Sequence, residues 1–165
     1  MKALGFTLTE MLVVLAILGL LAYFGLPALL QYGTQNRLTT CQAALRQIAR
    51  LQSQWFSDHR SYASLSQLGY PVDSSLAAIY LNKDSSIAGH ASADAVYRIT
   101  VRLGSLSAGE PTAQEIQASG AAYYLITAQP INDQAGDSRC GTLSLASTGQ
   151  VGATGTQGEA ACWQK

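Results

Sequence analysis

The chain has 165 residues, with ten basic and ten acidic side chains that cancel at neutral pH. This balance gives no reason to expect a nucleic-acid binder or an enzyme acting on acidic substrates. The length suits one membrane segment and one modest domain, because single domains cluster near about 100–150 residues.

An uncharged apolar segment begins close to the N-terminus. Residues 11–30 contain no charged side chain, and as a helix they would extend about 30 Å, the thickness of a bilayer's hydrocarbon core. We therefore expect a transmembrane helix. A secretory signal removed after this segment fits less well, because the segment is long and no small-x-small cleavage site follows it.

A single carboxylate, Glu10, stands at the start of this segment. An acid at the centre of a bilayer costs roughly 2.5–3.5 kcal/mol on insertion scales, so such a residue usually has a function. The alternative is that Glu10 lies near the membrane surface and extends to water.

The residues around Glu10 form a longer motif. Gly5-Phe6-Thr7-Leu8-Thr9-Glu10, followed by the apolar run, resembles the N-terminal signature of type IV prepilins, a family of major and minor pilins and of type II secretion pseudopilins. The resemblance implies a leader at residues 1–5, cut by prepilin peptidase between Gly5 and Phe6, and N-methylation of Phe6. Residues 6–30 then form the transmembrane and assembly helix, and residues 31–165 the exported globular domain.

Cleavage before Phe6 would place a positive amine four residues, or one helical turn, ahead of Glu10. The carboxylate would also lie in the first turn, where the helix dipole favours negative charge. Neither charge is tolerable unpaired in hydrocarbon. We therefore expect the amine of one subunit to pair with Glu10 of a neighbour, which makes Glu10 an assembly residue.

The helix is expected to continue beyond the membrane. Apolar residues recur at steps of three and four, the pattern of an amphipathic helix with one buried stripe: Leu38, Cys41, Leu45, Ile48, Leu51 and Trp55. One helix of about fifty residues, ending at 58–61, is the simplest interpretation. Gly19 and Pro27 should loosen it, and the family resemblance implies that this segment loosens during assembly.

Three strands are predicted after the helix. Residues 97–103 alternate strictly, with Tyr97, Ile99, Val101 and Leu103 on the core face. Residues 123–128 and 141–146 form the other two, whereas 72–95, 105–120, 130–136 and 152–158 are expected to be irregular or loops. Three or four antiparallel strands packed on the second half of the helix make an α+β domain, and the resemblance implies the pilin fold.

Cys140 and Cys162 lie 22 positions apart (162 − 140). In an oxidising compartment this spacing suits a loop-closing disulfide worth about 3 kcal/mol. The surrounding residues, Cys140-Gly141-Thr142-Leu143 and Cys162-Trp163, also resemble the disulfide-bounded C-terminal loop of PilE-type minor pilins. Cys41 belongs to the apolar stripe and should be buried and free.

Catalytic chemistry is not indicated. His59 and His90 lack partners for a triad, and the glycine-rich residues 152–158 lack the Lys-Ser/Thr ending of a phosphate loop. Asp133 and Asp137 could hold calcium, but two acids in such a loop more often form turns. We expect no enzyme, cofactor or metal.

These features predict a structural minor subunit of a type IV pilus that supports pilus biogenesis, twitching motility and adhesion. Its implied partners are other pilin subunits, prepilin peptidase and the inner-membrane assembly platform. It would span the inner membrane once, with a periplasmic C-terminus, and later lie in the surface pilus. The alternatives are a DNA-uptake or major pilin, a pseudopilin, and a membrane-anchored binding module that never polymerises. The scattered arginines make nucleic-acid binding the weaker alternative.

Overall fold

A computed structural model describes the backbone of residues 7–104 and 122–163, and the side chains of these ranges except 24–34. The chain divides into two compact units, Met1–Asn36 and Arg37–Lys165. Each unit is described by itself.

Helix α1 (Leu8–His59) is 52 residues long. It begins after Thr7, whose Oγ1 accepts a hydrogen bond from the Glu10 backbone N–H at 3.3 Å. Thr7 and Glu10 thus occupy the two positions of a capping box, S/T-x-x-E. After His59, Arg60 adopts a left-handed conformation with φ 56°, which ends the helix. The predicted helix of about fifty residues is confirmed.

Large apolar side chains cover the described part of α1 in the first unit. From Leu8 to Tyr23 they are 46–77% exposed. Over the side chains that the structure describes, no helix reaches both the length and the hydropathy of a membrane span. Gly19 has open space where a Cβ would lie, whereas Pro27 falls in the stretch whose side chains lie outside the described residues.

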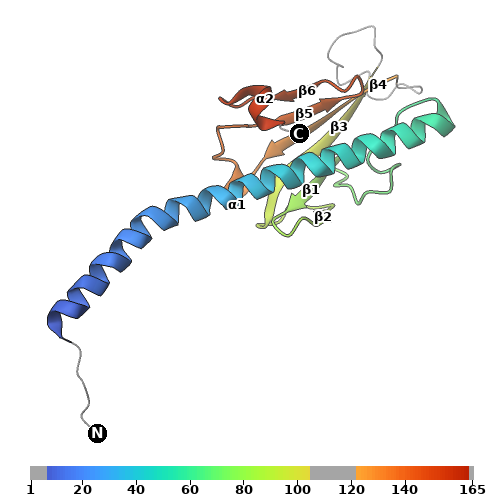
Figure 1. Ribbon diagram of the computed structural model, residues 1–165. Coiled ribbons are helices and arrows are strands. Elements are labelled where there is room, and N and C mark those ends of the chain that lie inside the picture. Colours follow the sequence, from blue (N-terminus) through green and yellow to red (C-terminus); the bar gives the residue numbers. More distant parts are fainter. Residues whose placement is uncertain (1–6, 105–121, 164–165) are drawn as a thin grey trace. The chain divides into compact units, whose positions relative to one another are not determined.

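The second unit contains a six-stranded sheet in the order β2-β1-β3-β4-β5-β6 (Figure 1). All neighbouring strands are antiparallel. The strands are β1 (Ala78–Asn82), β2 (Ile87–Ala88), β3 (Ala95–Gly104), β4 (Tyr123–Pro130), β5 (Leu143–Ala146) and β6 (Val151–Ala153). The described residues of this unit also form two short helices, η3 (Asn132–Gln134) and α2 (Gly158–Cys162).

The core lies between one face of the sheet and the part of α1 within this unit (Figure 1). The predicted core face of β3 is confirmed, because Tyr97 and Ile99 are buried while Val101 and Leu103 pack against the core. Their neighbours on the same face follow from the strand register, which places Ile99 between Ile79 of β1 and Ala128 of β4. The second unit is therefore the predicted α+β domain.

The sheet has more strands than the sequence predicted. Residues 72–95, expected to be irregular, contain β1 and β2, and residues 152–158, expected to be a flexible loop, begin inside β6. β1 is buried on both faces from Ala78 to Leu81, so its sequence cannot show the alternation of a half-exposed strand. The predicted loop at 105–120 lies outside the described residues.

A buried glutamine fixes the chain just beyond the end of α1. The Gln52 side chain is fully buried, and its Nε2 donates to the Ala63 carbonyl at 2.6 Å. In return, the Ala63 N–H donates to Gln52 Oε1 at 2.8 Å. One amide thus satisfies both backbone groups of a residue that is itself buried.

We predict that Gln52→Ala lowers the free energy of unfolding by about 2–6 kcal/mol. Two buried backbone groups would lose their partners, at about 1–3 kcal/mol each. Thermal unfolding should show a fall in Tm of about 2–4 °C per kcal/mol. The matched control is Gln54→Ala, an exposed position on the same helix, which should change stability by less than about 0.5 kcal/mol. Equal losses of stability in the two variants would contradict the predicted contribution of the Gln52–Ala63 hydrogen bonds.

Candidate functional site

The first candidate site is the start of α1, where Glu10 is the single charged residue between Thr7 and Tyr23. The Thr7 cap places Glu10 in the first turn of the helix. Its exposed carboxylate is therefore held near the positive end of the helix dipole, among exposed apolar side chains. The helix dipole stabilises the negative charge of Glu10 at this position, so the carboxylate can pair with a cation at one level of a mainly apolar surface. Gly5 and Phe6, the predicted cleavage residues, lie outside the described residues.

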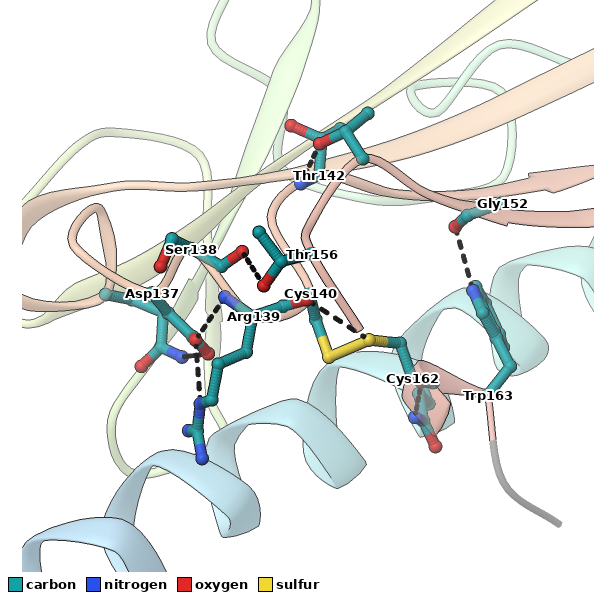
Figure 2. Close-up of a disulfide and its surroundings, with 12 residues drawn as sticks. Asp137, Ser138, Arg139, Cys140, Thr142, Gly152, Thr156, Cys162 and Trp163 are labelled. Carbon is teal, nitrogen blue, oxygen red and sulfur yellow. Dashed lines mark hydrogen bonds and ion pairs between the residues drawn. A yellow bond between two sulfur atoms is a disulfide. The ribbon is translucent and has the colours of Figure 1, made fainter. Parts of the chain in front are cut away.

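The second candidate site is the disulfide between Cys140 and Cys162, whose Cα atoms are 5.6 Å apart (Figure 2). The structure thus contains the predicted closure of the C-terminal loop. Both cysteines are buried. Gly155 lies against the backbone of the Cys140 segment, and a Cβ at Gly155 would be 2.2 Å from the Arg139 carbonyl oxygen. The backbone at Gly155 therefore lies directly against the backbone of Arg139 and Cys140.

Side chains from outside the loop hold its C-terminal end in place. Gln42, buried on α1, donates from Nε2 to the Cys162 carbonyl. The Trp163 indole N–H donates to the Gly152 carbonyl at 2.9 Å (Figure 2). The role of Gln42 was not predicted. Its signal in the sequence is a polar residue beside Cys41 that lies on the apolar stripe, four positions after Leu38.

Cys41 is free and fully buried, as predicted. Burial raises the pKa of its thiol well above the ordinary range, because the thiolate would be desolvated. A thiol kept protonated in this way is a poor nucleophile. Cys41 is therefore a core residue.

Asp133 and Asp137 are each held by a cation rather than brought together. Lys83 Nζ lies 2.7 Å from Asp133 Oδ2, and its hydrogen bond lowers the pKa of that carboxyl. Arg139 Nε donates to Asp137 Oδ1 at 3.1 Å. Within residues 7–104 and 122–163 no cluster of three or more metal-ligating side chains is present. The arrangement favours the turn role of these acids over calcium binding.

The third candidate site is the outer face of the sheet, the face turned away from α1. Here β3 and β4 line a hollow of about 520 Å³. Arg98 donates to Gln129 Oε1, and the Thr100 and Thr127 hydroxyls are 2.7 Å apart. Arg102 is exposed beside them. The sequence did not predict this site. The alternation of β3 indicates which face meets the core, but it does not show that polar side chains of β3 and β4 line one hollow.

Two further arginines that form no ion pair with a described residue, Arg46 and Arg50, lie on α1. Arg46 and Arg50 are exposed on α1, whereas Arg98 and Arg102 line the hollow on the outer sheet face. None of the four forms an ion pair with a residue that the structure describes. These four arginines are therefore divided between α1 and the outer sheet face.

We predict that native Cys41 resists iodoacetamide at pH 8.5 and reacts once the chain is unfolded, while peptide mapping recovers Cys140 linked to Cys162. At and above this pH the native thiol stays protonated, whereas the unfolded thiol, with a pKa of about 8.5, loses its proton. The free energy of unfolding should therefore fall as pH rises above about 8.5. Cys41→Ala should make this fall shallower. Equally fast labelling of native and unfolded chains would contradict the buried position.

Two family models match the chain. The model described as type IV minor pilin ComP, DNA uptake sequence receptor, matches residues 27–144, and the prokaryotic N-terminal methylation motif matches residues 1–22. No curated protein gives a significant match. The first model covers most of the chain and includes the part of α1 packed on the sheet, as well as β1 to β4. The predicted resemblance is confirmed, and the chain belongs to the type IV minor pilins.

Proposed function

We propose that this protein is a minor subunit of a type IV pilus that is anchored in the inner membrane and then assembled into the filament. The observation that carries the proposal is the start of α1, where large apolar side chains are exposed around the helix. A helix that is apolar all round is normally buried. Each such side chain gains about 1.5–3 kcal/mol when it leaves water, so the segment from Leu8 to Tyr23 strongly favours an apolar environment.

Two apolar environments are available to such a helix in this proposal: the bilayer before assembly and a bundle of helices in the filament afterwards. Lipid tails are as apolar as leucine, so transfer between the two involves little hydrophobic driving force. A polar contact must then set the position of each helix along its neighbours. Glu10 is the candidate, paired with the new amine at Phe6 of an adjacent subunit.

The match of residues 1–22 to the N-terminal methylation motif supports the proposed processing. Prepilin peptidase would cut between Gly5 and Phe6 and methylate Phe6. The inner-membrane assembly platform would then extract the subunit into the pilus, alongside other major and minor pilins. The C-terminal domain would be periplasmic before assembly and on the cell surface afterwards, where it supports pilus biogenesis, twitching motility and adhesion.

We predict that Glu10→Ala lowers incorporation into sheared pili about tenfold, the effect of losing about 1.4 kcal/mol from a contact. Membrane insertion and leader cleavage should be unchanged, so the intact mass of the membrane-bound variant should still begin at methylated Phe6. Thr9→Ala, at the preceding exposed position, is the control and should assemble normally. Normal incorporation of Glu10→Ala would remove the proposed register contact.

DNA uptake is the second candidate function, because the matching family model describes a DNA uptake sequence receptor. In this chain the exposed side of α1 presents Arg46 and Arg50 about 6 Å apart along the helix. A convex helix fits the major groove of a duplex, about 12 Å wide. The outer sheet face is hollow and suits a duplex less well. We infer that duplex DNA would contact the α1 arginines.

If this candidate is correct, log K should fall with log salt with a slope near −1.8, because two phosphates are neutralised at about 0.9 each. Arg46→Gln with Arg50→Gln should flatten the slope and weaken binding of the full chain in fluorescence anisotropy. The same changes at Arg98 and Arg102 should leave binding unchanged. The reverse pattern would place DNA on the sheet, and no binding by the wild type would remove the candidate.

A further inference from the structure

The hollow on the outer sheet face has the size of a site for a small or oligomeric ligand. Its volume of about 520 Å³ lies within the range of about 300–1,000 Å³ that is typical of ligand sites. β3 supplies Arg98, Thr100 and Arg102 on this face, and β4 supplies Leu125, Thr127 and Gln129. Arg98 and Arg102 are four residues apart on one strand, which separates their Cα atoms by about 13 Å.

The lining offers many hydrogen-bond donors and few acceptors. A guanidinium has five N–H donors, and the one contact of Arg98 within the lining is its bond to Gln129. Arg102 forms no ion pair with the residues that the structure describes. The Thr100–Thr127 hydroxyl pair uses one of its two donors internally. A complementary ligand is therefore rich in acceptors and carries anionic groups at intervals.

Three macromolecular classes fit this description to different degrees. Duplex DNA is contacted by convex elements that enter a groove, whereas this face is hollow. Its lining also contains no aromatic side chain on which the bases of a single strand could stack. A peptide would bring one backbone N–H per residue, each of which needs an acceptor. Sugar hydroxyls both donate and accept, so a polysaccharide can satisfy the lining with its own oxygens.

We propose that the outer face of β3 and β4 binds an acidic polysaccharide, with carboxylates on Arg98 and Arg102 and sugar oxygens on Thr100, Thr127 and Gln129. Guanidinium groups pair with carboxylates through two parallel hydrogen bonds. Leu125 adds an apolar surface for the ring carbons. The proposal names a ligand class for the adhesive role. It rests on the proposed function in one respect: the domain must be exposed outside the cell, where it can meet the polysaccharide.

The test is binding of a short oligogalacturonate to the full-length protein in detergent micelles, measured by calorimetry. The comparison ligand is the same oligosaccharide with its carboxylates reduced to alcohols. We expect Arg98→Gln with Arg102→Gln to lower affinity at least about tenfold, and carboxylate reduction to have a similar effect. Arg46→Gln with Arg50→Gln is the matched control and should bind like the wild type. Thermal unfolding verifies that the variants fold.

The proposal is overturned if the oligogalacturonate does not bind, if the control pair weakens binding as much as the sheet pair, or if carboxylate reduction has no effect. It is also overturned if duplex DNA or polyglutamate binds more tightly and loses affinity in the Arg98/Arg102 variant, because that result assigns the face to another class. Incorporation into sheared pili is scored separately. A failed pilin assignment and a failed ligand assignment are therefore distinguishable.

Discussion

The structure is governed by an apolar helical surface that the described chain does not bury. In the second half of α1, one apolar stripe packs against the sheet and the other side is polar. The domain around it therefore buries its own apolar surface. From Leu8 to Tyr23 the helix exposes apolar side chains throughout. A single chain therefore combines a self-sufficient domain with a segment that requires partners. Glu10, in the capped first turn, adds one charge to that segment. This charge marks one position along the helix axis at which a partner of opposite charge would be favoured.

The globular unit is held together by polar contacts at the ends of its elements as well as by its core. Gln52 connects α1 to the chain that leaves it, and Gln42 connects α1 to the chain end. Both are amides on the buried side of the helix, where each replaces an apolar side chain. Because the disulfide and the Trp163 indole act on the same segment, three contacts fix Cys162 and Trp163. The outer sheet face takes no part in these contacts, which leaves its polar side chains available for a ligand.

The sequence predicted the elements whose pattern reflects one buried face. The α1 stripe and the alternation of β3 each report which side meets the core, and the family signature located Glu10. The sequence did not predict β1, because a strand buried on both sides has no alternation. It did not predict β6 either, because glycine, here Gly152, favours loops by propensity. A Cβ at Gly152 would lie 2.5 Å from Ser144 Oγ, so a larger residue there would displace the Ser144 side chain. Gln42 and the arginines of the outer face depend on contacts between distant segments, which local patterns do not report.

Gly155 has a consequence for substitutions in the C-terminal loop. Its backbone lies where a side chain would collide with Arg139 and Cys140, and the Gly155 N–H donates to the Cys140 carbonyl at 2.9 Å. A larger residue at position 155 would push residues 154–157 away from residues 138–140, which hydrogen bonds join in the folded chain. The disulfide and these hydrogen bonds therefore hold the same end of the sheet together, one covalently and the others through the backbone. Cys41 is enclosed by the core, so its thiol is shielded from solvent oxidants in the folded chain.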